Sequence, residues 1–382
     1  WRTVSAADCG ACVSRKELSI YMEEKNQNRN QNPEQQQTPH KRRVRYKGTH
    51  PRRFEEKYKE LNPEKYQDTI EKVIRKGSTP AGMHISIMVR EIIDFLKIKP
   101  GQTGFDATLG YGGHTKAMLE CLKGQGHMYA TDVDPIESAK TKKRLADAGF
   151  GEDILTIRLQ NFCTIDEIAK EAGGFDFVLA DLGVSSMQID NPDRGFSFKV
   201  DGPLDLRLNP EKGISATERL AQIDEDELAG MLWENSDEPY AEELAHAIVT
   251  ERKHGKPIDT TTRLREVIEE TLSFLPEKEK KDTVKKTCQR TFQALRIDVN
   301  NEFEVLYEFM EKLPGALKPG GRAAILTFHS GEDKLVKKAL KQGYKEGVYS
   351  EIANDVVRPS AEECAQNGRA RSTKMRWAVR AE

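Results

Sequence analysis

The sequence predicts an α/β fold built on a doubly wound, mostly parallel sheet. Short apolar segments alternate with helical patterns from residue 84 onward. A glycine-rich loop follows the first apolar segment, and aspartates end the second and the fourth. In such sheets ligands bind outside the carboxyl ends of the strands. We therefore expect a ligand site where the loop and the aspartates meet.

The expected elements follow in chain order. Residues 86–96 place Ile87, Met88, Ile92 and Phe95 on one helical face. Strands are expected at residues 102–107, 127–132, 154–159, 175–181 and 322–328, and a helix over 115–122. Residues 208–288 lack strand patterning, and apolar residues recur there at helical spacing. This segment predicts a helical subdomain inserted between the fourth and fifth strands.

Composition limits the classes of function. Lys and Arg total 60 and Asp and Glu total 62, so the net charge of the 382 residues is -2. This excludes a protein that binds nucleic acid over its whole surface, and any polyanion site must be a local patch. No segment approaches the roughly 20 apolar residues of a membrane span. Cys121, Cys163, Cys288 and Cys364 show no metal-ligand spacing, so we expect a cytoplasmic protein without a metal.

The N-terminal region differs in composition from the rest. Residues 1–50 are expected to form a disordered polar and basic tail, because residues 26–39 are mostly Asn and Gln and cannot bury a core. Within it, residues 1–21, which include Cys9 and Cys12, are expected to be a non-native leader, since Met22 opens a run typical of a start. Residues 51–82 predict a helical basic extension and linker. Residues 41–60 carry nine Lys or Arg against three Glu, which suits either an RNA-contacting arm or a solvated tail.

The loop after the first strand indicates the kind of ligand. Residues 110–114 read G-Y-G-G-H, and Thr115 stands where a dinucleotide fingerprint has its third glycine. This argues against NAD, and the P-loop signature does not occur. Asp132 can accept both hydroxyls of an adenosine ribose, and Phe162 can stack on adenine. With Asp181 ending the fourth strand, the layout is that of a class I S-adenosylmethionine-dependent methyltransferase.

Five longer motifs make the prediction specific. They read D-L-G-V-S-S-M-Q-I-D (181–190), R-G-F-S-F (194–198), D-G-P-L-D-L-R (201–207), F-Q-A-L-R-I-D-V-N (292–300) and F-H-S-G-E-D-K (328–334). Over about residues 83–380 the chain closely resembles the RsmH (MraW) family of 16S rRNA cytosine-N4 methyltransferases. The resemblance implies S-adenosylmethionine-dependent N4-methylation of a cytidine in the decoding region of 16S rRNA, with the small ribosomal subunit as partner. We expect the methyltransferase domain over residues 83–207 and 289–382, interrupted by the helical insertion over residues 208–288.

The resemblance also implies roles for single residues. The cofactor positions of the family match Gly112, Gly113, His114, Asp132, Phe162, Asp181 and Gln188. The family's usual F-H-S-L-E-D-R differs here at Gly331 and Lys334, and its usual Y-G-E-E differs at Ala241. These departures concern substrate contacts, whereas the cofactor positions keep the expected residue types.

Methyl transfer to cytosine N4 needs an amine held in line with the methyl group and acceptors for its hydrogens. Asp181 is the candidate catalytic acceptor, and a cofactor contact is its competing role. The candidate substrate-binding residues are Ser185, Ser186, Arg194, Phe196, Phe198, Arg207 and Arg296. A structural ion pair remains the alternative for each arginine, and a place in the core remains the alternative for each phenylalanine.

Two other functions stay open from the residues alone. One is an amino-methyltransferase of the same fold that acts on another RNA or on DNA. The other is a non-catalytic RNA-binding factor of ribosome assembly. The presence of Gly112, Asp132 and Asp181 argues against the second, because a decayed site would be free to lose them. None of the motifs bears on oligomeric state.

Overall fold

The computed structural model describes residues 86–382. The predictions for the tail, the 41–60 arm, the basic extension, and Cys9 and Cys12 lie outside the described residues.

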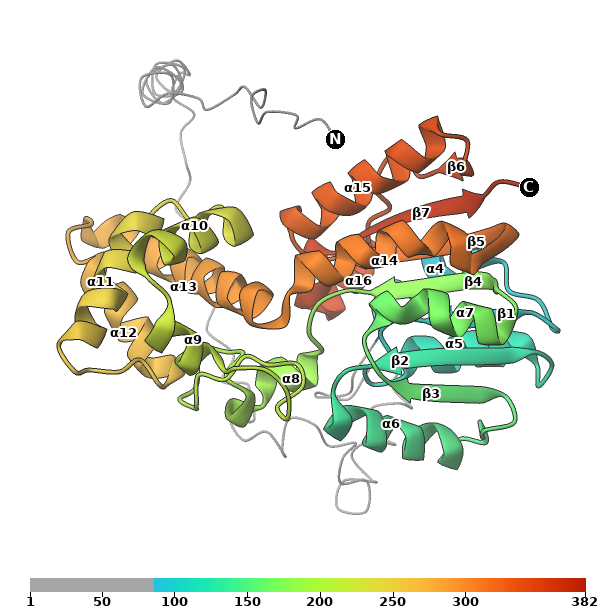
Figure 1. Ribbon diagram of the computed structural model, residues 1–382, viewed down its shortest axis with the longest axis horizontal. Helices are drawn as coiled ribbons and strands as arrows, with labels where there is room; N and C mark the ends of the chain where they lie inside the picture. The colour runs from blue at the N-terminus through green and yellow to red at the C-terminus, as the bar shows by residue number, and fades with distance from the viewer. Residues whose placement is uncertain (1–85) are drawn as a thin grey trace, which may run out of the picture. The chain divides into compact units, whose positions relative to one another are not determined.

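A seven-stranded sheet organises the described chain (Figure 1). Its strands are β1 (Thr103–Asp106), β2 (His127–Asp132), β3 (Leu155–Leu159), β4 (Phe175–Asp181), β5 (Leu317–Thr327), β6 (Tyr349–Ile352) and β7 (Lys374–Arg380). They lie in the order β3-β2-β1-β4-β5-β7-β6. β1 to β5 pair in parallel, and β7 pairs antiparallel with both β5 and β6. The predicted doubly wound, mostly parallel sheet is confirmed, whereas the sequence pattern does not predict β6 and β7.

Helices cover both faces of this sheet. One apolar core lies beneath α7 (Ile165–Ala172), α14 (Glu302–Ala316) and α15 (Ser330–Lys345). The other lies beneath α4 (Val89–Leu96), α5 (Gly113–Leu122) and α6 (Pro135–Asp147). β4 supplies both cores, because successive side chains of a strand point to opposite faces. Val178 and Ala180 enter the first core, and Phe177 and Leu179 the second.

Short helices occupy several of the connections. They are η2 (Phe162–Thr164) after β3, α8 (Ser186–Asp190) and η3 (Pro192–Arg194) after β4, and α16 (Ala361–Gln366) and η4 (Gly368–Ser372) before β7. Among residues 86–382, no helix combines the length and the apolar content needed to cross a bilayer.

Five helices between β4 and α14 pack around an apolar core of their own (Figure 1). They are α9 (Ala216–Gln222), α10 (Glu225–Ser236), α11 (Ala241–Lys253), α12 (Thr261–Thr271) and α13 (Glu277–Asn300). The apolar stripes that predict helices near residues 228–232 and 244–249 are buried in this core. α13 runs across the predicted boundary at residues 288 and 289, and its C-terminal turns reach the cavity described next.

Candidate active site

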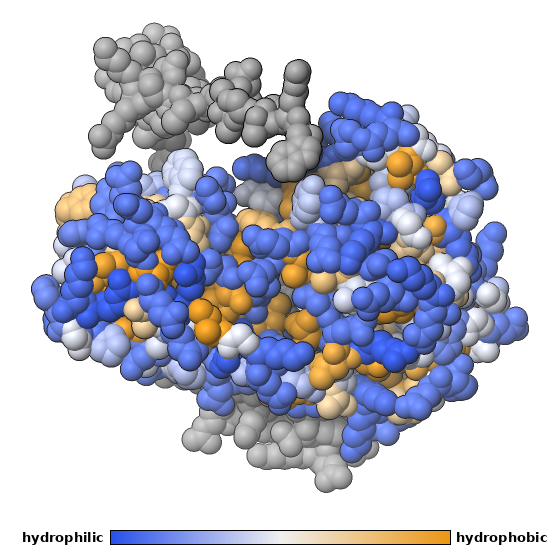
Figure 2. All heavy atoms as spheres, viewed as in Figure 1, coloured by the Kyte–Doolittle hydropathy of each residue, from blue (hydrophilic) through white to orange (hydrophobic). Residues whose placement is uncertain are grey.

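A cavity of about 390 Å³ opens at the carboxyl ends of β1, β2, β4 and β5. The glycine loop, Asp132, Asp181, the connection after β4 and the last turns of α13 line it. Figure 2 shows apolar side chains gathered between the helical subdomain on the left and the sheet on the right. The cavity therefore lies at the edge of the sheet where a ligand site is expected.

The glycine loop requires glycine at two positions. Gly112 has a φ of 81°, and a Cβ there would lie 2.6 Å from Cγ2 of Thr141. A Cβ on Gly113 would lie 2.0 Å from Oγ of Ser86. Thr141 also donates a hydrogen bond of 2.5 Å to the carbonyl oxygen of Gly110, so α6 holds the loop in place. Gly112 and Gly113 therefore line the cavity without a side chain.

Asp132 ends β2 and fastens the same loop. Its Oδ2 accepts from the backbone N–H of Gly110 and its Oδ1 from that of Asp134, both at 2.8 Å. Burial raises the pKa of the Asp132 carboxyl to about 6, despite these two hydrogen bonds. The carboxylate lines the cavity at the position expected for a ribose contact.

Asp181 ends β4 and faces His114 at the start of α5. Oδ2 of Asp181 lies 3.4 Å from Nδ1 of His114. Oδ1 is buried and has no hydrogen-bond partner among the described residues. Burial raises the pKa of the Asp181 carboxyl to about 6; His114 opposes this shift, while Asp106 and Glu332 add to it. The site thus holds a carboxylate oxygen free to accept a proton or a hydrogen bond.

Gln188 lines the cavity, but both ends of its side-chain amide are engaged within the protein. Its Oε1 accepts from the backbone N–H of Ser185, in a capping box at the start of α8. Its Nε2 donates to Oδ2 of the buried Asp134, at 2.9 Å. These contacts fix the connection after β4 against α6.

The predicted cofactor residues come together in the structure. All seven line the cavity: Gly112, Gly113, His114, Asp132, Phe162, Asp181 and Gln188. Ser185, Ser186 and Arg296, from the predicted substrate set, line it too. These positions are compatible with the predicted roles, which remain predictions.

Four predicted substrate residues lie outside the lining of the cavity. Arg194 is buried and forms an ion pair of 2.7 Å with Asp134. Arg207 forms an ion pair of 2.6 Å with Asp205. Phe196 and Phe198 pack against the core of the helical subdomain. These contacts are the structural alternatives that the sequence leaves open, namely ion pairs for the arginines and core packing for the phenylalanines.

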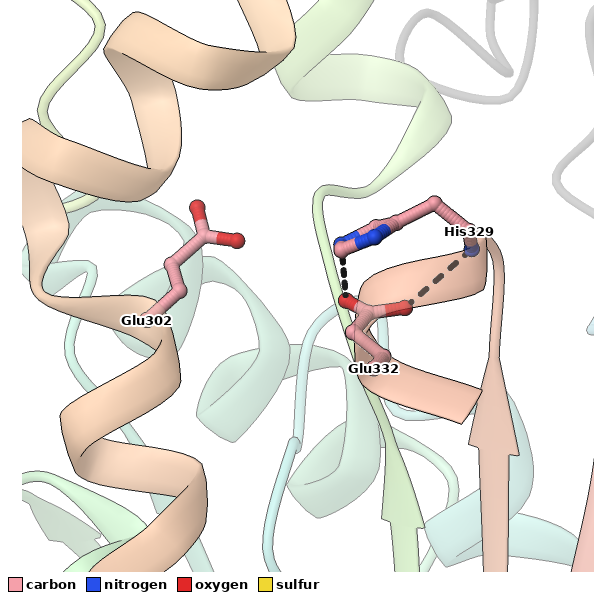
Figure 3. A group of neighbouring side chains, drawn as sticks. All are labelled: Glu302, His329 and Glu332. Atoms are coloured by element: carbon pink, nitrogen blue, oxygen red, sulfur yellow. Dashed lines mark hydrogen bonds and ion pairs between the residues drawn. The ribbon is translucent and has the colours of Figure 1, made fainter. Parts of the chain in front are cut away.

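Three cavity residues that the sequence analysis does not assign, Glu302, His329 and Glu332, lie close together (Figure 3). Arg296 donates two hydrogen bonds of 2.7 Å to Glu302 at the start of α14. Glu332 accepts from the backbone N–H of Phe328, at 2.8 Å, and its other carboxylate oxygen lies 3.1 Å from Nε2 of His329. Sequence reasoning could have identified His329 and Glu332 by their position, because the F-H-S-G-E motif directly follows the carboxyl end of β5.

Glu302, His329 and Glu332 bring their ligand atoms within 4.8 Å of one another, as a metal site would. The Arg296 guanidinium, however, already neutralises Glu302, and backbone N–H groups and His329 occupy Glu332. A divalent cation would have to displace this arginine or bind beside its positive charge. The donor set therefore suits hydrogen bonding better than metal binding.

Comparison with known proteins identifies the family. The family model described as the MraW methylase family matches residues 81–381. "Ribosomal RNA small subunit methyltransferase H 1" of Agathobacter rectalis is 82% identical over 343 residues, covering 90% of this chain and 98% of that protein. The protein of the same name from Lachnoclostridium phytofermentans is 71% identical and covers 91% and 95%. "Ribosomal RNA small subunit methyltransferase H 2" of Alkaliphilus metalliredigens is 64% identical and covers 89% and 97%.

The family match spans the sheet, the glycine loop and the helical subdomain alike, and the relatives align over nearly their whole length. The resemblance expected from the five motifs is therefore confirmed, and this chain belongs to the MraW methylase family.

Proposed function

We propose that this chain transfers the methyl group of S-adenosylmethionine to N4 of a cytidine in the decoding region of 16S rRNA. The observation that carries the proposal is one continuous cavity that joins the glycine loop and Asp132 to Asp181 and the Arg296–Glu302 pair. Methyl donor and acceptor must share one space for in-line transfer. The names of the close relatives support a ribosomal RNA substrate.

The residues present fit the cofactor. S-adenosylmethionine supplies an activated methyl group on a positively charged sulfonium. The glycine loop leaves backbone at the cavity wall, which suits close approach of a ligand. Each oxygen of Asp132 has one backbone donor and keeps capacity for a second, so it can accept from ribose hydroxyls. Phe162 lines the same end and packs edge-on against Phe309, which fixes its ring for a base contact.

Asp181 is the residue that we assign to the acceptor amine. The lone pair of a cytosine amine is conjugated into the ring, so the amine needs an acceptor that draws on its hydrogens. The Asp181 carboxylate lines the cavity, and its Oδ1 is a buried acceptor without a partner among residues 86–382. As the N–C bond forms and the C–S bond breaks, N4 loses one proton, and the Asp181 carboxylate, which lines the cavity, receives it.

The substrate must also deliver the base to a recessed site. A cytosine reaches Asp181 only after leaving its stack, at a cost of a few kcal/mol. Arg369 lies at the cavity wall, where its guanidinium can contact the RNA backbone while it pairs with Asp190. A ribosomal substrate implies action in the cytoplasm on the small subunit.

Nucleoside mass spectrometry of small-subunit rRNA tests the proposal. N4-methylcytidine should disappear when the gene is deleted. Wild-type protein and the exposed control Asp94→Asn should restore it, and Asp181→Asn should not. Unchanged N4-methylcytidine in the deletion strain would refute the proposed substrate. Full restoration by Asp181→Asn would refute the role of that residue alone.

A further inference from the structure

His114 is held between two acceptors. Its Nε2 lies 2.8 Å from the backbone carbonyl oxygen of Ile87, and its Nδ1 lies 3.4 Å from Oδ2 of Asp181. The ring is only 8% exposed, so both contacts form away from bulk water. The imidazole therefore connects the residues just before α4 to the end of β4.

These contacts constrain where protons lie. A peptide carbonyl can only accept, so Nε2 of His114 must carry a proton. In a neutral imidazole Nδ1 would then present a lone pair to the Asp181 carboxylate, and the two groups would repel. Attraction requires one more proton, either on Nδ1 or on Oδ2. The geometry thus favours a pair that holds one proton more than a neutral His114 beside an ionised Asp181.

The surrounding charges act in the same direction. Asp106 on β1 is fully buried near both groups, and Glu332 on α15 acts on Asp181. Among residues 86–382, His114 is the basic side chain found at ion-pair distance from Asp181. Burial, Asp106 and Glu332 together raise the pKa of the Asp181 carboxyl to about 6. Several carboxyl groups in one buried region favour retention of a proton.

We propose that Asp181 and His114 share one proton when the cavity is empty, and that binding of a cationic cofactor expels it. With the shared proton the pair is neutral, and without it the pair carries one negative charge. A positive charge in the same cavity stabilises the second state. Asp181 then enters the reaction ionised, as a carboxylate that can take up the proton that N4 releases. His114 is a positioning residue that sets the charge of Asp181. The inference rests on the proposed function, because it takes a sulfonium as the cation.

The shared proton can be tested without any cofactor. The chain has 8 histidines, so the ring nitrogens of His114 can be assigned by their loss in His114→Gln. In the empty full-length protein, the nitrogen chemical shifts of the His114 ring, which report where its protons lie, should change in Asp181→Asn. The control is His127, whose Nε2 lies 2.8 Å from Oγ1 of Thr156 and which is outside the cavity lining. Unchanged ring-nitrogen shifts of His114 in Asp181→Asn would overturn the shared proton.

The number of protons released when the cofactor binds is measured by calorimetry near pH 6.5, in buffers of different ionisation enthalpy. S-adenosylmethionine should release up to about one proton, and the uncharged S-adenosylhomocysteine much less. Asp181→Asn should abolish the difference, His114→Gln should reduce it at least twofold, and His127→Gln should leave it unchanged. Equal release for the two ligands, or equal effects of the two glutamine variants, would overturn the inference. Failure of both ligands to bind would instead refute the proposed function, while the chemical-shift test of the empty protein still stands.

Discussion

The buried ion pair between Asp134 and Arg194 joins three parts of the protein that surround the site. Oδ1 of Asp134 caps α6 by accepting from the backbone N–H groups of Ile136 and Glu137. Its Oδ2 accepts from Gln188 on α8 and from Nη1 of Arg194, at 2.7 Å. Asp134 is 0% exposed and Arg194 7% exposed. Breaking this pair should therefore destabilise the fold and loosen the cavity wall.

The two single substitutions should differ in cost. Asp134→Asn removes the negative charge and leaves the Arg194 guanidinium buried, with the carbonyl oxygens of Arg207 and Leu208 and at most one neutral amide oxygen as its partners. We expect a loss of about 4–5 kcal/mol in the free energy of unfolding, the upper part of the range for a buried pair that loses one partner. Arg194→Met leaves a carboxylate that still accepts three N–H groups, so we expect about 3 kcal/mol. The double variant should cost about 2 kcal/mol less than the sum.

Urea denaturation of the four proteins gives the coupling energy directly. The matched control is the pair of Lys142 and Glu152, which has the same distance of 2.7 Å but side chains 58% and 81% exposed. A cycle on that pair should give no measurable coupling, because water screens it. If the buried pair proved additive, or if both cycles gave equal coupling, the argument that burial decides the strength of these pairs would be refuted.

Four further predictions follow from the site and the sequence. Asp132→Ala should weaken S-adenosylmethionine binding by about 2–4 kcal/mol, measured by calorimetry, and unchanged affinity would refute the ribose contact. Burial raises the pKa values of Asp132 and Asp181 to about 6, so their contribution to stability is largest at low pH and falls as the pH rises from about 4 through 6. Asparagine at either position should make this fall in the free energy of unfolding less steep, as measured by urea denaturation at several pH values. An equally steep fall in the variants would contradict the raised pKa values. Gly112→Ala should lower the melting temperature and the cofactor affinity together, since a positive φ and a 2.6 Å contact oppose the new methyl group. The control Gly124→Ala also has a positive φ, but its methyl group would contact no neighbour, so it should lower the melting temperature alone. Deleting residues 22–60 should flatten the salt dependence of RNA binding without changing cofactor affinity, and an identical salt slope would indicate a solvated tail.

The sheet could be predicted where its strands are apolar and buried on both faces. β2 and β4 have the bounds expected from the sequence, because runs such as F-D-F-V-L-A-D have few other places to pack. β7 reads K-M-R-W-A-V-R, and its charged residues hide the strand pattern. Arg376 in this strand is nevertheless buried, since Asp333 on α15 accepts from its Nε at 2.6 Å. A strand whose burial depends on a partner 43 positions away cannot be found from local patterning.

The difference between local and distant partners also explains the outcome for the three arginines predicted to bind the substrate. Arg207 pairs with Asp205 two positions away, and Arg296 pairs with Glu302 across the end of one helix. Both partners are therefore close in the sequence. The partner of Arg194 is 60 positions away and becomes its neighbour only when α6 and the connection after β4 pack together. Of the three, only Arg296 lines the cavity, and it does so with its charge already balanced. A paired guanidinium still offers N–H donors in a fixed direction, which suits recognition of a base edge better than attraction of a phosphate. Position at the end of α13, rather than positive charge, is therefore what makes Arg296 a candidate for substrate contact.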